Sequence, residues 1–190
     1  MYKTYTLLII LTTFLTACAG NATAQANEIT PTVAPEKIEP TTTIEFLSKE
    51  PPASCPVTVP QDATFVPPSP YDTLGWDSYF WFGSASLWTS LPKDGVWAGL
   101  PDNPEGYTQK VFWWRDGYVW NEEPEPNLIV TGERLDAQAP SLKGSKATNA
   151  YANDIGSAML VGVDFPTLGC WKITGKYADA ELSFVVWVAP

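Results

Sequence analysis

The chain of 190 residues contains no histidine, and this absence removes several kinds of catalytic and metal site. A Ser-His-Asp triad, a Cys-His pair and a histidine-ligated metal all need an imidazole. The three cysteines are too few for a four-thiolate zinc site. The glycine patterns GxGxxG and GxxxxGK[ST] are also absent, so nothing predicts a loop that holds nucleotide phosphates. We therefore predict no cofactor, no metal and no catalytic residue.

Basic residues are scarce. The chain has 11 Lys+Arg against 21 Asp+Glu, a formal net charge of −10. Nucleic-acid binding depends on basic side chains that neutralise phosphates, so this balance argues against a nucleic-acid partner. It argues equally against a basic patch that docks on anionic lipid headgroups.

No apolar run is long enough for a transmembrane helix, which needs about 20 residues. The uncharged run over residues 4–17 follows Lys3 and has the length of a signal-peptide core. It ends in LTAC, residues 15–18, which looks like a bacterial lipobox. We predict a lipoprotein signal peptide over residues 1–17 and a lipid on Cys18, which would anchor the protein in the cell envelope, outside a bacterial membrane. The alternative is an ordinary cleaved signal peptide.

Residues 18–51 are rich in Asn, Thr, Ala, Pro and Glu, and their one aromatic residue is Phe46. Such a segment cannot bury enough apolar surface to offset the entropy lost on ordering. We predict a flexible linker over 18–51 and a folded domain over 52–190.

Residues 52–190 contain many short apolar runs, with turn signals about every ten residues and no stripe of 3.6-residue period. This pattern predicts an all-β fold, an antiparallel immunoglobulin-like β-sandwich. We expect one hairpin over residues 86–100 and a second over 109–121, which turns on Asp116-Gly117, a pair typical of type I′ turns. Helix is expected as one turn at most, around residues 150–153.

With Cys18 lipidated, Cys55 and Cys170 remain in an exported protein, and we predict a disulfide between them. The alternative is two free thiols. Alternation along residues 170–177 places Cys170 on the outward face of its strand. The disulfide would therefore hold the segment around Cys55 over that outer face. In the final strand, alternation also places Trp187 outward.

The closing strands carry a resemblance. FPTLGCWKITG over residues 165–175, followed by LSFVV over 182–186, resembles the closing F–G hairpin of bacterial immunoglobulin-like domains. Residues 107–188 are similar to a group of bacterial lipoproteins and secreted proteins with the same Gly-Cys-Trp ending. The resemblance implies architecture and no activity. Leu168 stands where immunoglobulin domains have a corner tyrosine, and Cys170 points outward, so an antibody-type core disulfide is not expected.

The most aromatic stretch is FWWRDGYVW, residues 112–120. Alternation about the expected turn places Phe112, Trp114 and Val119 in the core and the opposite face towards solvent, where aromatic rings can stack on a sugar or a partner. The alternative is that neighbouring loops cover this face. The candidate ligand-binding residues are Trp113, Arg115, Tyr118, Trp120 and, from the last strand, Trp187.

We therefore expect a binding or surface-structural protein without catalysis, whose partners are the membrane, through the lipid, and a glycan or protein at the cell surface. One alternative is a carbohydrate-binding module that uses the exposed aromatics. Another is a glycosidase-like enzyme, which would need two of the carboxylates of Asp77, Asp94, Glu105 and Asp116 across one cleft. The acidic loops contain no DxDxDG pattern, so calcium is not expected.

Overall fold

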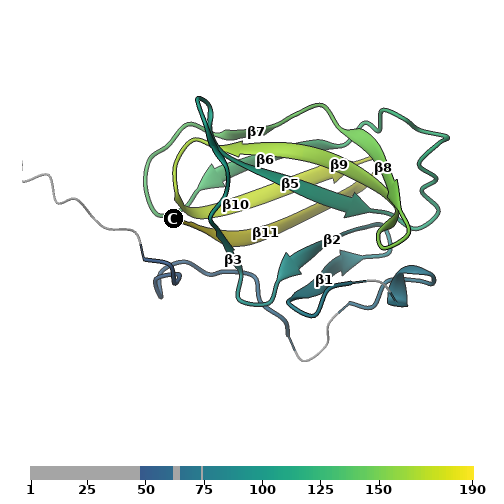
Figure 1. Ribbon diagram of the computed structural model, residues 1–190, viewed down its shortest axis with the longest axis horizontal. Coiled ribbons are helices and arrows are strands. Elements are labelled where there is room, and N and C mark those ends of the chain that lie inside the picture. Colours follow the sequence, from purple (N-terminus) through teal and green to yellow (C-terminus); the bar gives the residue numbers. More distant parts are fainter. Residues whose placement is uncertain (1–47, 62–64, 74) are drawn as a thin grey trace, which may run out of the picture. The chain divides into compact units, whose positions relative to one another are not determined.

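A computed structural model describes residues 48–61, 65–73 and 75–190 (Figure 1). The predicted signal peptide, the lipidation of Cys18 and most of the predicted linker lie outside these residues. In the described part of the chain, no helix has the length and apolar character needed to cross a membrane.

The fold is all-β, as predicted. Its one helical element among the described residues is a short 3-10 turn, η1 (Tyr71–Thr73). The strands in chain order are β1 (Tyr79–Ser84), β2 (Leu87–Pro92), β3 (Val96–Ala98), β4 (Asp102–Asn103), β5 (Gly106–Trp114), β6 (Ile129–Arg134), β7 (Leu142–Gly144), β8 (Thr148–Ala152), β9 (Gly156–Phe165), β10 (Gly169–Tyr177) and β11 (Ala180–Ala189).

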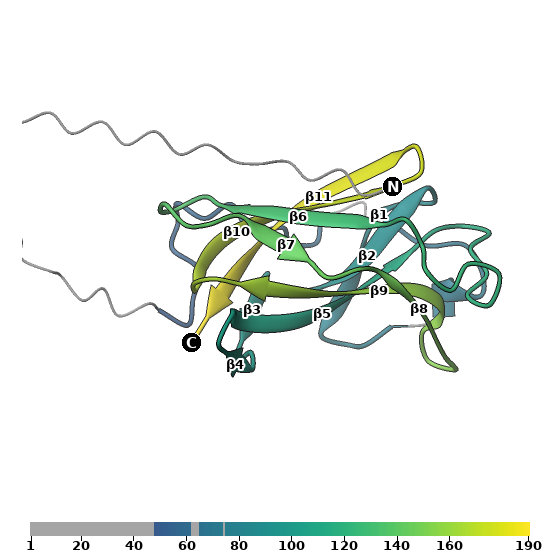
Figure 2. The same cartoon turned by 90° about the horizontal axis from the view of Figure 1, so that it is seen from above.

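The strands form one mixed sheet in the order β1-β2-β5-β9-β7-β6-β10-β11-β3, with β4 on β5 and β8 on β9. Every pairing is antiparallel except that of β11 with β3. The sheet curls on itself, so that β5 and β9 face β10 and β11 across the core (Figures 1 and 2). Because β7 pairs with both β6 and β9, it joins these two layers into one sheet. The immunoglobulin-like sandwich is therefore not confirmed.

The main core lies inside this curl. Alternation in the last two strands is as predicted: Trp171 and Ile173 of β10 are buried there, as are Phe184 and Val186 of β11. Phe165 from β9 packs edge-on against Trp171, with ring centroids 5.6 Å apart. Each strand directs every second side chain into this core, and strands of both layers contribute to it.

The hairpin expected over residues 86–100 is wrong. β2 pairs with β1, and β3 runs parallel to β11. Gly95 has a φ of +70° and closes a turn, because its N–H donates to the carbonyl of Pro92. Its own carbonyl then accepts a hydrogen bond from the N–H of Trp187 (2.9 Å). This contact directs the chain along β11 instead of back along β2.

The hairpin expected over residues 109–121 is also wrong. β5 pairs with β9 and β2, and the chain after Asp116-Gly117 forms no returning strand. A type I′ turn needs positive φ at both central residues. Gly117 has φ +75°, but among the described residues Ala178 is the one non-glycine with positive φ, so Asp116 does not meet this condition. The N–H of Asp116 donates instead to the carbonyl of Ala85, which ties the turn to the β1–β2 loop.

The helical turn expected around residues 150–153 is wrong as well. Residues 148–152 form β8, which pairs antiparallel with β9. The chain turns between these two strands through Gly156, at a φ of +64°. The backbone N–H and C=O groups of β8 therefore find their hydrogen-bond partners in β9 and not within a helix.

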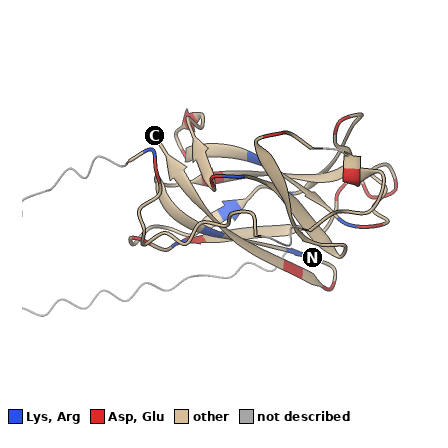
Figure 3. Cartoon of the chain, turned by 90° about the horizontal axis from the view of Figure 1, so that it is seen from below, with Lys and Arg blue, Asp and Glu red and all other residues tan. Residues whose placement is uncertain are grey.

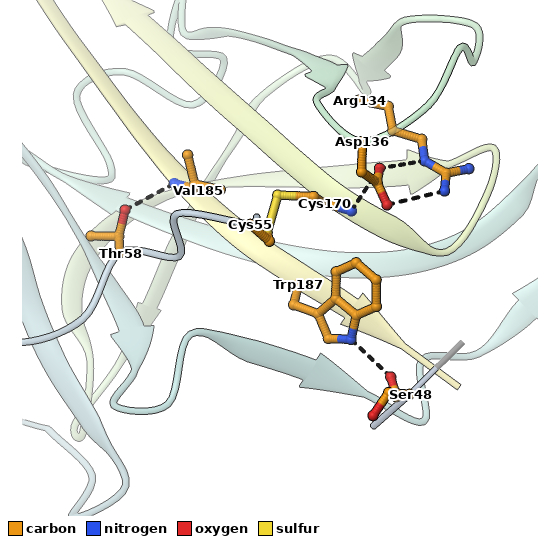
Figure 4. The surroundings of a disulfide bond; sticks show 8 residues. All are labelled: Ser48, Cys55, Thr58, Arg134, Asp136, Cys170, Val185 and Trp187. Carbon is orange, nitrogen blue, oxygen red and sulfur yellow. Dashed lines mark hydrogen bonds and ion pairs between the residues drawn. A yellow bond between two sulfur atoms is a disulfide. The ribbon is translucent and has the colours of Figure 1, made fainter. Parts of the chain in front are cut away.

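The predicted disulfide between Cys55 and Cys170 is present and closes a separation of 115 residues (Figure 4). The N-terminal segment, residues 48–60, lies over the outer face of β11, as the outward position of Cys170 predicted. The Thr58 N–H donates to the Val185 carbonyl (2.8 Å), and the Val185 N–H donates to the Thr58 hydroxyl (2.9 Å). Beside these hydrogen bonds, both cysteines pack with Trp187 and Ala189 in a small outer core.

Asp136, which follows β6, holds the backbone of β10 at Cys170. Its carboxylate accepts hydrogen bonds from Arg134 Nε (2.7 Å) and from the N–H of Cys170 (3.1 Å) (Figure 4). Burial raises the pKa of Asp136, but these hydrogen bonds and the guanidinium charge lower it by more, so the pKa is below its ordinary value. The carboxylate thus fixes the backbone of Cys170 while it stays ionised.

Candidate ligand-binding groove

Trp113 and Tyr118 are buried, with 0% and 7% of their surfaces exposed, so the prediction that they face solvent is wrong. Val111 and Trp113 lie on the side of β5 that faces the main core, whereas Phe112 and Trp114 lie on its other side. The Trp113 ring packs on Phe184, with centroids 5.7 Å apart. Trp113 is a core residue.

Phe112 and Trp114 lie on the opposite side of β5, in an aromatic cluster outside the sheet. Trp81 packs edge-on against Trp114, with ring centroids 5.0 Å apart and an interplanar angle of 88°. Tyr71 covers the neighbouring Trp88 in the same way. Trp114 is fully buried, as predicted, and Phe112 is partly buried, but both lie in this second cluster and not in the main core between the layers. The expectation that Val119 is a core residue is wrong, because Val119 is exposed.

Trp187 is on the outer side of β11, as predicted, but it is not open to a ligand. The N-terminal segment covers it, which leaves 2% of its surface exposed. Its indole N–H donates to the carbonyl of Ser48 (2.9 Å) (Figure 4). Its role is to hold this segment in place.

Arg115 and Tyr118 belong to a network that fixes the loop after β5. The Arg115 guanidinium lies 5.6 Å from the centre of the Tyr177 ring and 3.3 Å from the Asp179 carboxylate. The hydroxyls of Tyr118 and Tyr177 donate to the carbonyl and the carboxylate of Glu123, respectively. Burial, together with the nearby Glu123 charge, raises the pKa of each tyrosine to about 12. Internal partners occupy these side chains.

Trp120 is exposed, as predicted. It stacks on Tyr151 with centroids 5.5 Å apart and an interplanar angle of 23°. The side-chain amide of Asn149 donates to the Trp120 carbonyl (2.6 Å), which secures the loop to β8. Each ring covers one face of the other, so the pair offers less stacking surface than two separate rings would.

A groove lies between residues of β2 and β5. The ribbons of these two strands diverge in Figure 1. The two strands are in register only at Trp88–Trp114 and Thr89–Trp113. Beyond these two pairs, side chains make the hydrogen bonds to the backbone of β5 that a neighbouring strand would otherwise make. The Thr89 hydroxyl donates to the Phe112 carbonyl (2.8 Å), and the Lys110 N–H donates to Oε1 of Gln109 (2.9 Å). The resulting groove has a volume of about 360 Å³.

Aromatic rings form much of the groove. Trp97 reaches it from the main core, where it packs on Phe165 and Phe184. Trp76 remains 40% exposed and meets Tyr79 edge-on, with centroids 5.6 Å apart. The aromatic lining consists of Trp76, Tyr79, Trp97, Phe112 and Trp114.

The lining also contains four polar residues: Ser78, Ser90, Gln109 and Lys110. Lys110 takes part in none of the ion pairs found between described residues. A second hollow of about 350 Å³ adjoins the groove at Trp76 and Tyr79, and Asp77 is among its lining residues. An apolar concavity with a few polar groups is typical of ligand sites.

The groove is a better candidate than the larger hollow of about 560 Å³ between β1 and the β10–β11 turn. Val59, Gln61 and Phe65 line that larger hollow, so the chain's own N-terminal region already occupies part of its wall. Its lining also has fewer aromatic rings.

The carboxylates considered for an enzyme include two that line different hollows. Asp77 lines the hollow beside Trp76, whereas Asp116 lines a different one beside Tyr118. In the described ranges, no three acidic or cysteine side chains are close enough to hold a metal ion. Figure 3 shows the acidic residues spread over several loops of the described chain.

No protein-family model matches the chain, and neither the curated proteins nor the solved structures that were compared contain a match. The fold and the groove define a class only: an all-β protein with one curled sheet, a disulfide-fastened N-terminal segment and an aromatic groove beside β5.

Proposed function

We propose that this protein is a lipid-anchored binding protein of the bacterial cell envelope, without catalysis, that holds its ligand in the groove between β2 and β5. The observation that carries the proposal is the exposed Trp76 side chain at a groove whose lining residues include four further aromatic residues. Large exposed aromatic side chains beside a hollow usually mark a contact surface.

The location rests on two features of the chain. The motif LTAC at residues 15–18 looks like a lipobox, and the Cys55–Cys170 disulfide suits an oxidising compartment outside the cytoplasm. An acidic, soluble domain on a lipid would meet its ligand at the cell surface.

The anchor predicts a labelling result. Cells that express the protein with a radioactive fatty acid in the medium should label the wild-type chain and leave Cys18→Ser unlabelled, because the thioether forms on this sulfur. Cys55→Ser serves as the matched control and should retain its label. Labelling that persists in Cys18→Ser would contradict the proposed anchor.

The groove predicts that binding depends on Trp76. Full-length protein in detergent micelles would be screened by fluorescence against a panel of soluble oligosaccharides and a panel of short peptides. We expect Trp76→Ala to weaken the binding of any hit about tenfold, because the exposed ring supplies the stacking surface. Trp120→Ala removes an equally exposed ring elsewhere and should bind as the wild type does. A hit that is insensitive to Trp76→Ala, or the absence of any hit, would contradict the proposal.

A further inference from the structure

The ring arrangement in the groove suits a ligand that has both apolar faces and a polar rim. Trp76 and Tyr79 meet at an interplanar angle of 68°, so together they form a corner and not a flat stack. Ser78 and Ser90 lie beside these rings. A pyranose ring presents C–H groups on its faces and hydroxyls around its edge, which matches an aromatic surface with interleaved hydroxyl groups.

The same groove is poorly suited to an added peptide strand. Strand addition needs a row of free backbone groups along a sheet edge. On the edge of β5 that faces the groove, Gln109 already accepts the N–H of Lys110, and Thr89 already donates to the carbonyl of Phe112. Side chains of the protein thus cap the positions that a peptide would need.

Lys110 adds a charge preference. Its side chain lies at the edge of the groove, is exposed and has no ion-pair partner among the described residues. On a chain with a net charge of −10, such an ammonium group is a local attraction for an anion. The adjoining hollow is lined by Asp72, Asp77 and Lys93, so it contains charges of both signs. In the groove itself, Lys110 is the charged residue of the lining.

From these contacts we infer that the groove binds a carbohydrate chain that carries carboxylate groups, with a sugar ring stacked on Trp76 and Tyr79 and a carboxylate beside Lys110. This inference rests on the proposed function and names the class of ligand for that site. Gln109 is placed to hydrogen-bond a sugar hydroxyl, because its Oε1 is held by the chain while its amide nitrogen has no partner among the described residues.

Two soluble oligosaccharides test the inference. Tetragalacturonate carries a carboxylate on every ring, whereas cellotetraose is neutral. Titration calorimetry on the full-length protein in detergent micelles at low ionic strength should show tetragalacturonate binding about tenfold more tightly. Salt at 0.5 M should remove most of this difference, since the partly exposed charge is screened.

Variants separate stacking from charge. Trp76→Ala should weaken the binding of both sugars about tenfold, while Lys110→Gln should weaken tetragalacturonate alone and bring its affinity to that of cellotetraose. Lys143→Gln is the matched control, because Lys143 is also an exposed strand lysine without an ion pair. Unchanged circular dichroism and melting temperature would show that each variant is folded.

Equal affinity for the two sugars, or an affinity for tetragalacturonate that Lys110→Gln leaves unchanged, would overturn the inference. A peptide that binds in a Trp76-dependent manner, with neither sugar binding, would overturn it and leave the proposed binding function intact. Failure of both sugars and all peptides to bind in a Trp76-dependent manner would overturn the inference and the proposed function together.

Discussion

Replacing Cys55 and Cys170 together by alanine should lower the free energy of unfolding by about 3–5 kcal/mol. The disulfide joins residues that are 115 apart in the chain, so its loss frees a long loop in the unfolded state. Both cysteines are buried, and the small outer core around them would also lose packing contacts. Urea unfolding followed by tryptophan fluorescence measures this loss as a lower midpoint.

The effect should also be visible locally, because the disulfide holds the N-terminal segment on β11. Two hydrogen bonds link Thr58 to Val185, and one links the Trp187 indole to Ser48. Without the disulfide, these contacts should open more often than the rest of the sheet. Hydrogen exchange at the Thr58 amide should therefore accelerate more than exchange at amides in the centre of β10.

Cys18→Ser is the control for this experiment, because it removes a cysteine and leaves the disulfide intact. We expect its unfolding midpoint to match that of the wild type in the same detergent. A double variant with an unchanged midpoint would contradict the prediction. It would mean that the segment detaches independently and contributes nothing to the stability of the sheet.

The disulfide and the closing strands could be predicted because their signals are local. Alternation along residues 170–177 and 181–188 requires no knowledge of distant segments, and it placed Cys170 outward. With Cys18 predicted to carry a lipid, Cys55 was the expected partner of Cys170, and this pairing predicted that the segment around Cys55 covers the outer face. The structure confirms the disulfide and this covered outer face.

Strand pairing could not be predicted from turn residues alone. Asp116-Gly117 is typical of hairpins, but the Asp116 N–H bonds to the Ala85 carbonyl, and β5 continues the sheet between β2 and β9. Likewise, Gly95 turns the chain onto β11 because its carbonyl meets the Trp187 N–H. Both outcomes depend on partners at least 31 residues away in the chain, since Asp116 and Ala85 are the closer pair, at 116 − 85 = 31.

The candidate groove was missed for a related reason. It exists because β2 and β5 separate after two paired positions, and the ring of Trp97, from β3, reaches the space between them. Of its rings, Phe112 and Trp114 were expected in the core, and no pattern distinguished Trp76 from the other tryptophans. Exposure of a single aromatic residue before a strand leaves no periodic signal in the sequence.

Trp113 offers the sharpest test of the corrected assignment. If its ring were a ligand-binding surface, replacing it would alter binding and leave stability nearly unchanged. The ring is fully buried between the two layers, so Trp113→Ala should lower the free energy of unfolding by about 3–5 kcal/mol. Urea unfolding measures this loss, and Trp120→Ala, which truncates an exposed ring, should cost less than about 1 kcal/mol.

The contact of Trp113 with Gly175 refines this prediction. A Cβ added at Gly175 would lie 2.5 Å from the Trp113 ring, so Gly175→Ala should destabilise the wild type by about 1–3 kcal/mol. In the Trp113→Phe background the smaller ring leaves room for that methyl group. The indole N–H of Trp113 has no hydrogen-bond partner among the described residues, so phenylalanine forfeits no hydrogen bond. Gly175→Ala should therefore cost less in Trp113→Phe than in the wild type, a coupling that a double-mutant cycle measures. Additive effects of the two substitutions would show that the ring does not lie against β10.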